Sequence, residues 1–210
     1  MEPLFSIRGL RYLDILAYPD LDIQQGQTTF LQGESGAGKS TLLKLLNATL
    51  NPSAGQVFYL GQDILALDTL ALRREAILVA QDAWLFPGSI RDNFTHYRAY
   101  RGEGPLDDRL LRDSLHTCAL DLPLETDSKV LSGGERQRVF LAICLAFSPR
   151  ALLMDEPTSA LDEATAHTLF TRLTSCARER GISLVAVSHD KALASHFAQR
   201  VITITGRVSA

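Results

Sequence analysis

Long hydrophobic runs, cysteine and an excess of positive charge are scarce or absent in this sequence. The longest apolar run, residues 139–147, is nine residues long, whereas a membrane-spanning helix needs about 20. The net charge of −3 gives no electrostatic reason to expect a nucleic-acid partner. The three cysteines, Cys118, Cys144 and Cys176, are far apart and show no metal or redox spacing, which is typical of a reducing cytoplasm.

A targeting segment is also missing from the N-terminal residues, which lack a basic region followed by an apolar run. We therefore expect no signal peptide. If the protein works at a membrane, we expect another chain to hold it there.

The composition is that of a folded domain, because 46% of the 210 residues are hydrophobic and only 21% are charged. Segments with strand character alternate with segments of helical period. This alternation predicts an α/β fold with a mainly parallel sheet, preceded by an antiparallel β lobe. The expected strands are residues 5–8, 20–23, 28–31, 56–60, 77–80, 151–154, 183–187 and 201–204. The expected helices are residues 40–50, 65–75 and 165–180, the last ending at Gly181 as its C-cap.

Residues 88–146 differ from the rest of the chain because their pattern is mostly helical, with a Gly/Pro-marked loop at 102–105. We interpret them as an inserted helical subdomain. The remaining segments, 1–87 and 147–210, are then the core with its β lobe, and the whole chain is a single domain.

The clearest chemical pattern is G-x-x-x-x-G-K-S, between an expected strand and an expected helix. Glycines let backbone N–H groups wrap a phosphate chain, and the following helix directs its N-terminal dipole at the same anion. Lys39 is expected to reach the β- and γ-phosphates, and Ser40 to offer a hydroxyl to Mg²⁺. The plain alternative is a Gly-rich turn that carries Lys-Ser by coincidence. The residues expected at the nucleotide are Gly33, Glu34, Ser35, Gly36, Ala37, Gly38, Lys39, Ser40 and Thr41.

Two adjacent acids, Asp155 and Glu156, end the apolar strand at 151–154. Ligands of open α/β sheets bind at the carboxyl ends of the strands, so this pair is expected beside the phosphate loop. Asp155 is expected to hold Mg²⁺, directly or through water. Glu156 is expected to orient or deprotonate the water that attacks the γ-phosphate. By itself such a pair is more often a solvated turn, and the loop motif is what favours the catalytic interpretation.

The stretch L-S-G-G-E, residues 131–135, precedes the apolar run at 139–147. It predicts a helix N-terminus with exposed N–H groups, which is a second anion site without a lysine of its own. The plain alternative is an ordinary serine N-cap. Two phosphate-binding helix starts about ninety residues apart are hard to explain unless both meet one nucleotide.

These segments together resemble the nucleotide-binding subunit of an ATP-binding cassette (ABC) transporter, over nearly the whole chain. Six motifs in the family's order carry the resemblance: the Walker A loop at residues 33–40, the Q-loop Gln81, the signature at 131–135, Walker B with its catalytic glutamate at Asp155 and Glu156, the D-loop at 159–162, and the switch His189. The fold that it implies is that of a phosphate-loop (RecA-like) NTPase with Mg²⁺ and ATP as cofactors.

The resemblance also implies a head-to-tail homodimer in which each ATP lies between Walker A of one subunit and the signature of the other. In that arrangement Ser132, Gly133 and Gly134 touch the γ-phosphate in trans. Gln81 senses Mg²⁺ and the attacking water, His189 bonds the γ-phosphate, and Asp162 acts across the dimer. The other four histidines are expected to have ordinary surface or core roles: His96, His116, His167 and His196.

The sequence leaves two questions about aromatic residues undecided: which tyrosine stacks on adenine, and whether residues 84–86 form a partner site. Tyr12 is the candidate for stacking on adenine, and Tyr18 is the alternative, because the turn after Tyr12 is short. Trp84, Leu85 and Phe86 follow the Q-loop, where the family forms the groove for a permease coupling helix. Exposed aromatics there favour a partner site, and a place in the subdomain core is equally compatible with the sequence.

The segment 85–93 is similar to export-type cassettes, and the compact layout is similar to small bacterial efflux ATPases, including the iron-export kind. The resemblance implies an integral membrane permease as partner and a cytoplasmic place on the inner face of the membrane, with no nucleic acid. A non-transport cassette ATPase of DNA repair or translation is the alternative. An unrelated phosphate-loop kinase or GTPase would leave residues 131–135 and His189 without a role.

Overall fold

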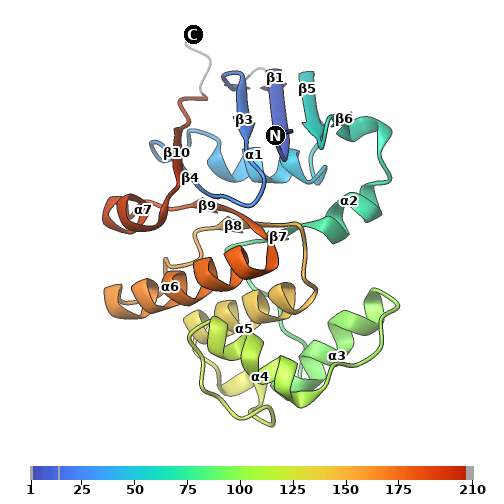
Figure 1. Ribbon diagram of the computed structural model, residues 1–210, viewed down its shortest axis with the longest axis vertical. Helices are drawn as coiled ribbons and strands as arrows, with labels where there is room; N and C mark the ends of the chain where they lie inside the picture. Colours follow the sequence, from blue (N-terminus) through green and yellow to red (C-terminus); the bar gives the residue numbers. More distant parts are fainter. Residues whose placement is uncertain (1, 14, 207–210) are drawn as a thin grey trace.

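The computed structural model describes residues 2–13 and 15–206, which form two sheets and the helices around them (Figure 1). In the antiparallel sheet, β1 (Phe5–Tyr12) pairs with β2 (Leu16–Ala17), β3 (Leu21–Ile23) and β5 (Ala54–Tyr59), and β6 (Gln62–Asp63) extends β5. The second sheet is parallel throughout, in the order β10-β4-β9-β8-β7. Its strands are β4 (Thr28–Gln32), β7 (Ala76–Val79), β8 (Ala151–Asp155), β9 (Ser183–Val187) and β10 (Arg200–Thr203). The predicted α/β class is confirmed.

The helices connect these strands and cover them. The α-helices are α1 (Lys39–Leu46), α2 (Thr69–Glu75), α3 (Ile90–Tyr100), α4 (Asp108–Thr117), α5 (Gly133–Ala146), α6 (Glu163–Arg180) and α7 (Lys191–Phe197). Two 3₁₀ turns, η1 (Ile64–Ala66) and η2 (Ser128–Val130), precede α2 and α5. None of the helices in residues 2–13 and 15–206 combines the length and apolar character that crossing a membrane requires.

The parallel sheet is buried on both faces, which is why its strands are continuous apolar runs. Successive side chains of a strand point to opposite faces. In β8, Leu152 and Met154 therefore belong to one apolar cluster, shared with α5 and α6, whereas Ala151 and Leu153 belong to another, shared with α1 and the antiparallel sheet. Helix α1 thus lies between the two sheets, and α5 and α6 cover the opposite face (Figure 1).

Two of the expected boundaries differ from the structure for local reasons, and a third is as predicted. The predicted helix over 65–75 is divided, because Leu67 is extended and the Asp68 side chain accepts a bond from the Leu70 N–H and so begins α2. The strand expected at 5–8 continues to Tyr12, since it pairs with β2 and β5 beyond the alternating segment. The predicted end of the long helix is confirmed, because Gly181 has φ of +68°, in the left-handed region that suits glycine.

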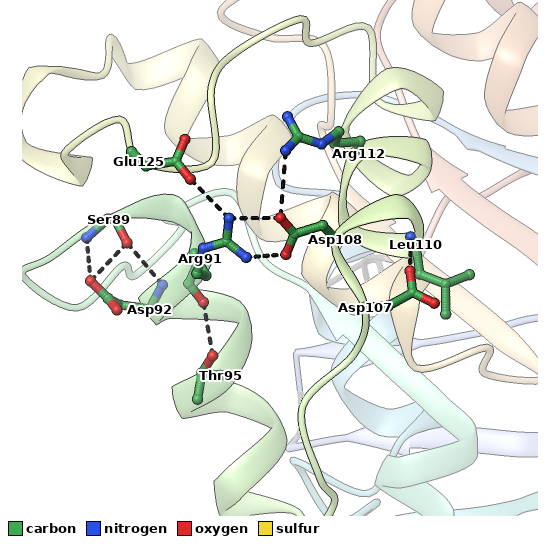
Figure 2. Close-up of polar contacts among 9 residues, drawn as sticks. All are labelled: Ser89, Arg91, Asp92, Thr95, Asp107, Asp108, Leu110, Arg112 and Glu125. Atoms are coloured by element: carbon green, nitrogen blue, oxygen red, sulfur yellow. Dashed lines mark hydrogen bonds and ion pairs between the residues drawn. The ribbon is translucent and has the colours of Figure 1, made fainter.

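Residues 88–146 contain α3, α4, η2 and α5, with polar contacts between the first two helices and the segment that follows them. Figure 2 shows the Arg91 guanidinium between Asp108 and Glu125, with Arg112 on the other side of Asp108. These hydrogen bonds to Arg91 lower the pKa of both carboxyls. Arg91 therefore joins the start of α3 to the start of α4 and to the chain before η2.

Candidate nucleotide-binding site

The phosphate loop connects the buried strand β4 to α1, and its glycines are required by space and by conformation. Gly33 and Gly38 have φ of +151° and +89°. A Cβ on Gly33 would clash with the Ile204 carbonyl, and one on Gly38 would lie 2.7 Å from the Tyr18 hydroxyl. No side chain caps α1. Its first N–H groups are therefore available to an anion, in the orientation that favours negative charge.

Lys39 is buried across this loop, with only 6% of its surface exposed. Its Nζ donates to the carbonyls of Gly33, at 3.0 Å, and of Glu34, at 2.9 Å. The ammonium group therefore holds the loop closed on itself and keeps one donor for a further acceptor. A positive charge at this place complements the phosphates that the loop amides can bind.

Ser40 and Asp155 meet although 115 positions separate them in the sequence. The Ser40 hydroxyl donates to a carboxylate oxygen of Asp155 at 2.8 Å, and Asp155 is the last residue of β8. Burial raises the pKa of Asp155, the neighbouring Glu156 raises it further, and the Ser40 bond opposes that shift. A nearby cation would favour the ionised form.

A hydroxyl beside a carboxylate is a donor set that Mg²⁺ accepts, provided that phosphate oxygens and waters complete the octahedron. In the part of the chain that the structure describes, no cluster of three or more His, Cys, Asp or Glu residues could hold a metal without such help. The residues therefore fit a nucleotide-bound Mg²⁺ rather than an independent metal centre.

Glu156 and His189 face each other beside the phosphate loop. His189 Nε2 lies 3.3 Å from Glu156 Oε1. One cavity, of about 420 Å³, lies between the loop and the end of β9 and is lined by Gly33, Glu34 and His189 among others. A second, of about 470 Å³, is lined by both Glu156 and His189. His189 thus borders both the loop and the space in front of the carboxylate.

Ser132 caps α5 and forms a reciprocal capping box with Glu135. The Ser132 amide and hydroxyl donate to Glu135 Oε2 at 2.9 and 2.7 Å, and the Glu135 amide donates back to Ser132 Oγ at 3.3 Å. These bonds lower the pKa of Glu135. Ser132 and Gly133 are exposed, whereas Gly134 is buried. The geometry is that of an ordinary N-cap, with its outer face open to solvent.

The remaining expected site residues take different positions. Gln81 is exposed just after β7, and Asp162 caps α6 by accepting from the Thr165 N–H at 2.9 Å. The Thr165 hydroxyl also bonds Asp162 and lowers the pKa of that carboxyl. Tyr12 is half-buried at the end of β1.

Tyr18, the alternative adenine partner, lies underneath the phosphate loop. It is only 5% exposed, and its hydroxyl donates to the Gly38 carbonyl at 2.9 Å. Its ring therefore supports the loop from the core side, and burial raises the pKa of its hydroxyl. Of the two tyrosines, Tyr12 has the more exposed ring.

The aromatic segment after the Q-loop is divided between core and surface. Trp84 is 66% exposed, whereas Leu85 is buried. Phe86 packs its ring against His96, Tyr97 and Tyr100 of α3. Leu85 thus belongs to the core, Trp84 is open to solvent, and the partner site stays a prediction.

Sequence reasoning missed two residues that support the site. Ile204 lies against Gly33 of the loop, and its N–H donates to the Gln32 carbonyl at 2.7 Å. Gln137 is buried on α5, and its Nε2 donates to the Glu156 carbonyl at 3.2 Å. The sequence marks Gln137 only as a polar residue near the start of an apolar helix. It marks Ile204 only as part of the expected strand 201–204.

Comparison with known proteins places this arrangement in a family. The family model described as "ABC transporter" matches residues 16–159. The chain belongs to the ABC transporter family. It is 35% identical over 208 residues to the probable iron export ATP-binding protein FetA of Escherichia coli, with 97% of this chain and 92% of FetA covered. It is 36% identical to the lipoprotein-releasing system ATP-binding protein LolD of Geobacter metallireducens, with 96% and 92% covered.

Solved structures agree with this assignment. A bacterial Atm1-family ABC exporter with ATP bound superposes with a TM-score of 0.86 at 26% identity, covering all of this chain and 38% of that one. A dimeric ATP-binding cassette in a post-hydrolysis state, bound to ADP and Pi, superposes with a TM-score of 0.81 at 26% identity, covering 95% and 94%. The prediction of an ATP-binding, ATP-hydrolysing subunit of an ABC transporter is confirmed.

Proposed function

We propose that two copies of this chain bind two ATP molecules between them, head to tail. The observation that carries this proposal is the placement of the two helix starts on opposite faces of the parallel sheet. The loop helix α1 packs on the face toward the antiparallel sheet, and the signature helix α5 packs on the other (Figure 1). A second copy can bring its own Ser132 and Gly133 to the phosphates held by the loop of the first.

Each site residue has a role in this proposal. The loop amides from Gly33 to Thr41 and the Lys39 ammonium bind the phosphates, and the Tyr12 ring stacks on adenine. Ser40, Asp155 and Gln81 hold Mg²⁺, which when bound neutralises charge on the β- and γ-phosphates. Glu156 accepts a proton from the attacking water, and His189, 3.3 Å away, donates a hydrogen bond to the γ-phosphate. Asp162 contributes across the dimer from the start of α6.

The proposed partner beyond the second copy is an integral membrane permease, which would hold the chain on the cytoplasmic face. The surface that we assign to it contains Trp84 and Tyr100, which are 66% and 76% exposed, and the Tyr100 ring stacks on that of Phe86. Exposed aromatics are common anchors of protein interfaces. We propose that the segment 88–146 moves with this surface relative to the core of residues 1–87 and 147–210.

The cargo is proposed from the relatives. FetA is named for iron export, and a Rhodopseudomonas palustris relative named for hemin import is also 35% identical. Identity alone therefore does not separate the directions. We propose export of a metal ion, on the resemblance of segment 85–93 to export-type cassettes. Reconstitution with the native permease in vesicles, with this chain facing the outer solution, tests it: ATP-driven accumulation of iron inside the vesicles, away from the ATPase, supports export, and ATP-driven release of iron from them contradicts it.

The dimer is tested with Glu156→Gln, which keeps ATP binding but removes the proposed base. We expect this variant to hydrolyse ATP at least about 100-fold more slowly and to form a stable dimer in Mg²⁺-ATP. Light scattering coupled to size exclusion measures the mass. Glu179→Gln, at the far end of α6, is the matched control and should behave as the parent protein. A monomeric Glu156→Gln variant in saturating Mg²⁺-ATP would contradict the shared site.

A further inference from the structure

We propose that Gln137 is a positioning residue that connects the signature helix to the catalytic carboxylate of the same chain. The inference rests on the proposed role of Glu156 as the base. It concerns a residue outside all six motifs, and it gives α5 a second task besides presenting Ser132 and Gly133.

Glu156 has a backbone conformation that needs support. Its φ is +51°, in the left-handed region that L-residues other than glycine rarely adopt. Such residues persist when the surrounding structure holds them, and they concentrate at functional sites. The Glu156 N–H donates to the Val187 carbonyl at 3.2 Å. Its carbonyl accepts from both the amide and the hydroxyl of Ser159, each at 3.2 Å.

Gln137 adds a further bond to the same carbonyl, and it comes from a different element. The Gln137 side chain is buried, with 4% of its surface exposed, and its Nε2 lies 3.2 Å from the Glu156 carbonyl oxygen. A buried amide is costly unless it is hydrogen-bonded, so this contact is strongly specified. Ser159 restrains Glu156 from within its own loop, whereas Gln137 restrains it from α5.

A second contact attaches the first turn of α5 to the chain just after Glu156. A Cβ on Gly134 would lie 3.0 Å from Leu161 Cδ2 and 3.1 Å from the Ala160 carbonyl oxygen. A Cβ here would require Leu161 and the Ala160 carbonyl to move by a few tenths of an ångström, so glycine suits this close approach. Helix α5 therefore contacts the Glu156 segment at two places, through Gly134 and through Gln137.

The consequence is a mechanical link between the two sites of the proposed dimer. Ser132 and Gly133 lie at the start of α5, where they would meet the ATP held by the partner. Gln137 lies one turn further along the same helix and bonds the backbone carbonyl of Glu156, the residue whose carboxylate would act on the chain's own ATP. A shift of α5 on engaging the partner's ATP would change the position of Glu156. Hydrolysis at one site would then depend on closure at the other.

The test replaces Gln137 by methionine, which keeps the length and apolar stem and removes the donor. We expect kcat for Mg²⁺-ATP to fall about 10- to 100-fold, because a small misplacement of a catalytic group costs that much. The Kd for a fluorescent ATP analogue should stay within about twofold, since the phosphate loop is untouched. Ser183→Ala is the matched control. It removes an equally buried side-chain bond to a backbone amide, that of Gly26, at the opposite end of the sheet.

A second measurement does not depend on turnover. Hydrogen exchange of nucleotide-free protein should become faster in residues 155–161 of Gln137→Met and should stay unchanged there in Ser183→Ala. Unchanged exchange in the Gln137 variant would overturn the positioning role. Faster exchange with an unchanged kcat would overturn the link between Gln137 and hydrolysis, whereas the role of Glu156 itself is tested by Glu156→Gln. A fall in kcat matched by an equal loss of nucleotide affinity would also overturn the inference.

Discussion

The helix starts at Gly38 and at Ser132 are built in opposite ways. The first has a left-handed glycine in place of a side-chain cap, and a lysine as its first residue. The second is closed by the Ser132–Glu135 box, in which a carboxylate accepts from the cap itself. The first start therefore leaves its amides free and brings its own positive charge. At the second start, the Glu135 N–H is already hydrogen-bonded to Ser132 and the Glu135 carboxylate lies in the first turn. The second start is therefore poorly suited to bind an anion alone.

In the proposed dimer, this difference would let the two helix starts serve one reaction without competing for the same phosphate. The loop of α1 can hold a triphosphate by itself. The start of α5 can only complete a site whose charge is already neutralised by Lys39 and a cation. In the head-to-tail dimer that we propose, this division would make nucleotide binding the property of one chain and hydrolysis the property of two.

The largest expected effect comes from removing the positive charge of the first start. Lys39→Ala should weaken ATP binding about 10- to 100-fold, since hydrogen bonds to charged groups contribute about 1.5–3 kcal/mol each. Isothermal titration calorimetry on the isolated chain measures it. Lys129→Ala, an exposed lysine three residues before Ser132, is the control and should leave binding within about twofold. Equal losses of ATP affinity in the two variants would contradict the assignment of phosphate binding to Lys39.

A smaller loss of activity is expected at the second start, at Ser132. The capping box there has a matched counterpart on α3, which serves as a control. Ser89 caps α3 with Asp92 in the same way that Ser132 caps α5 with Glu135 (Figure 2). Ser89→Ala and Ser132→Ala should each lose about 1 kcal/mol of unfolding free energy, the usual cost of a lost N-cap. Only Ser132→Ala should also reduce kcat, by about tenfold, the loss of one charge-assisted bond of about 1.4 kcal/mol.

Urea unfolding measures the first quantity, and steady-state ATP hydrolysis measures the second. If the two variants lose activity equally, Ser132 acts only as a cap. Undiminished hydrolysis in Ser132→Ala would likewise remove the reason for assigning the second start to the partner's ATP.

The smallest effect concerns the contacts that support the subdomain. Arg91 lowers the pKa of Asp108 and Glu125, so their ionised forms favour the folded state. This stability is fully present above the unfolded pKa values, about 3.9 for Asp and 4.3 for Glu, and is lost as the pH falls through the lower folded values. Asp108→Asn should therefore be less stable than the parent at pH 7, and this difference should shrink as the pH falls below about 3.9. A difference that persists in acid would show that shape rather than charge is responsible.

Much of the fold follows from local pattern. The strand β9 has the expected bounds, 183–187, because five apolar or small residues between a Gly-Ile turn and a polar segment leave little choice. The divided helix at 64–75 could not be predicted as easily, since Leu65 and Leu72, seven residues apart, keep the helical spacing across the break. The capping carboxylate of Asp68 and the packing of η1 on β5 decide it.

The amino-acid sequence by itself determined which segments carry the chemistry. A strand, a Gly-rich loop with Lys39, two acids after an apolar strand and a serine before a helix are each specified by neighbours a few residues apart. Only the tertiary structure decided which of them meet. The bond between Ser40 and Asp155 depends on two parallel strands ending at one edge. The burial of Tyr18 under Gly38 and the reach of Gln137 to Glu156 depend on how layers pack. These contacts join residues far apart in the sequence, which helical or strand periodicity cannot relate. They depend on the packing of the whole core.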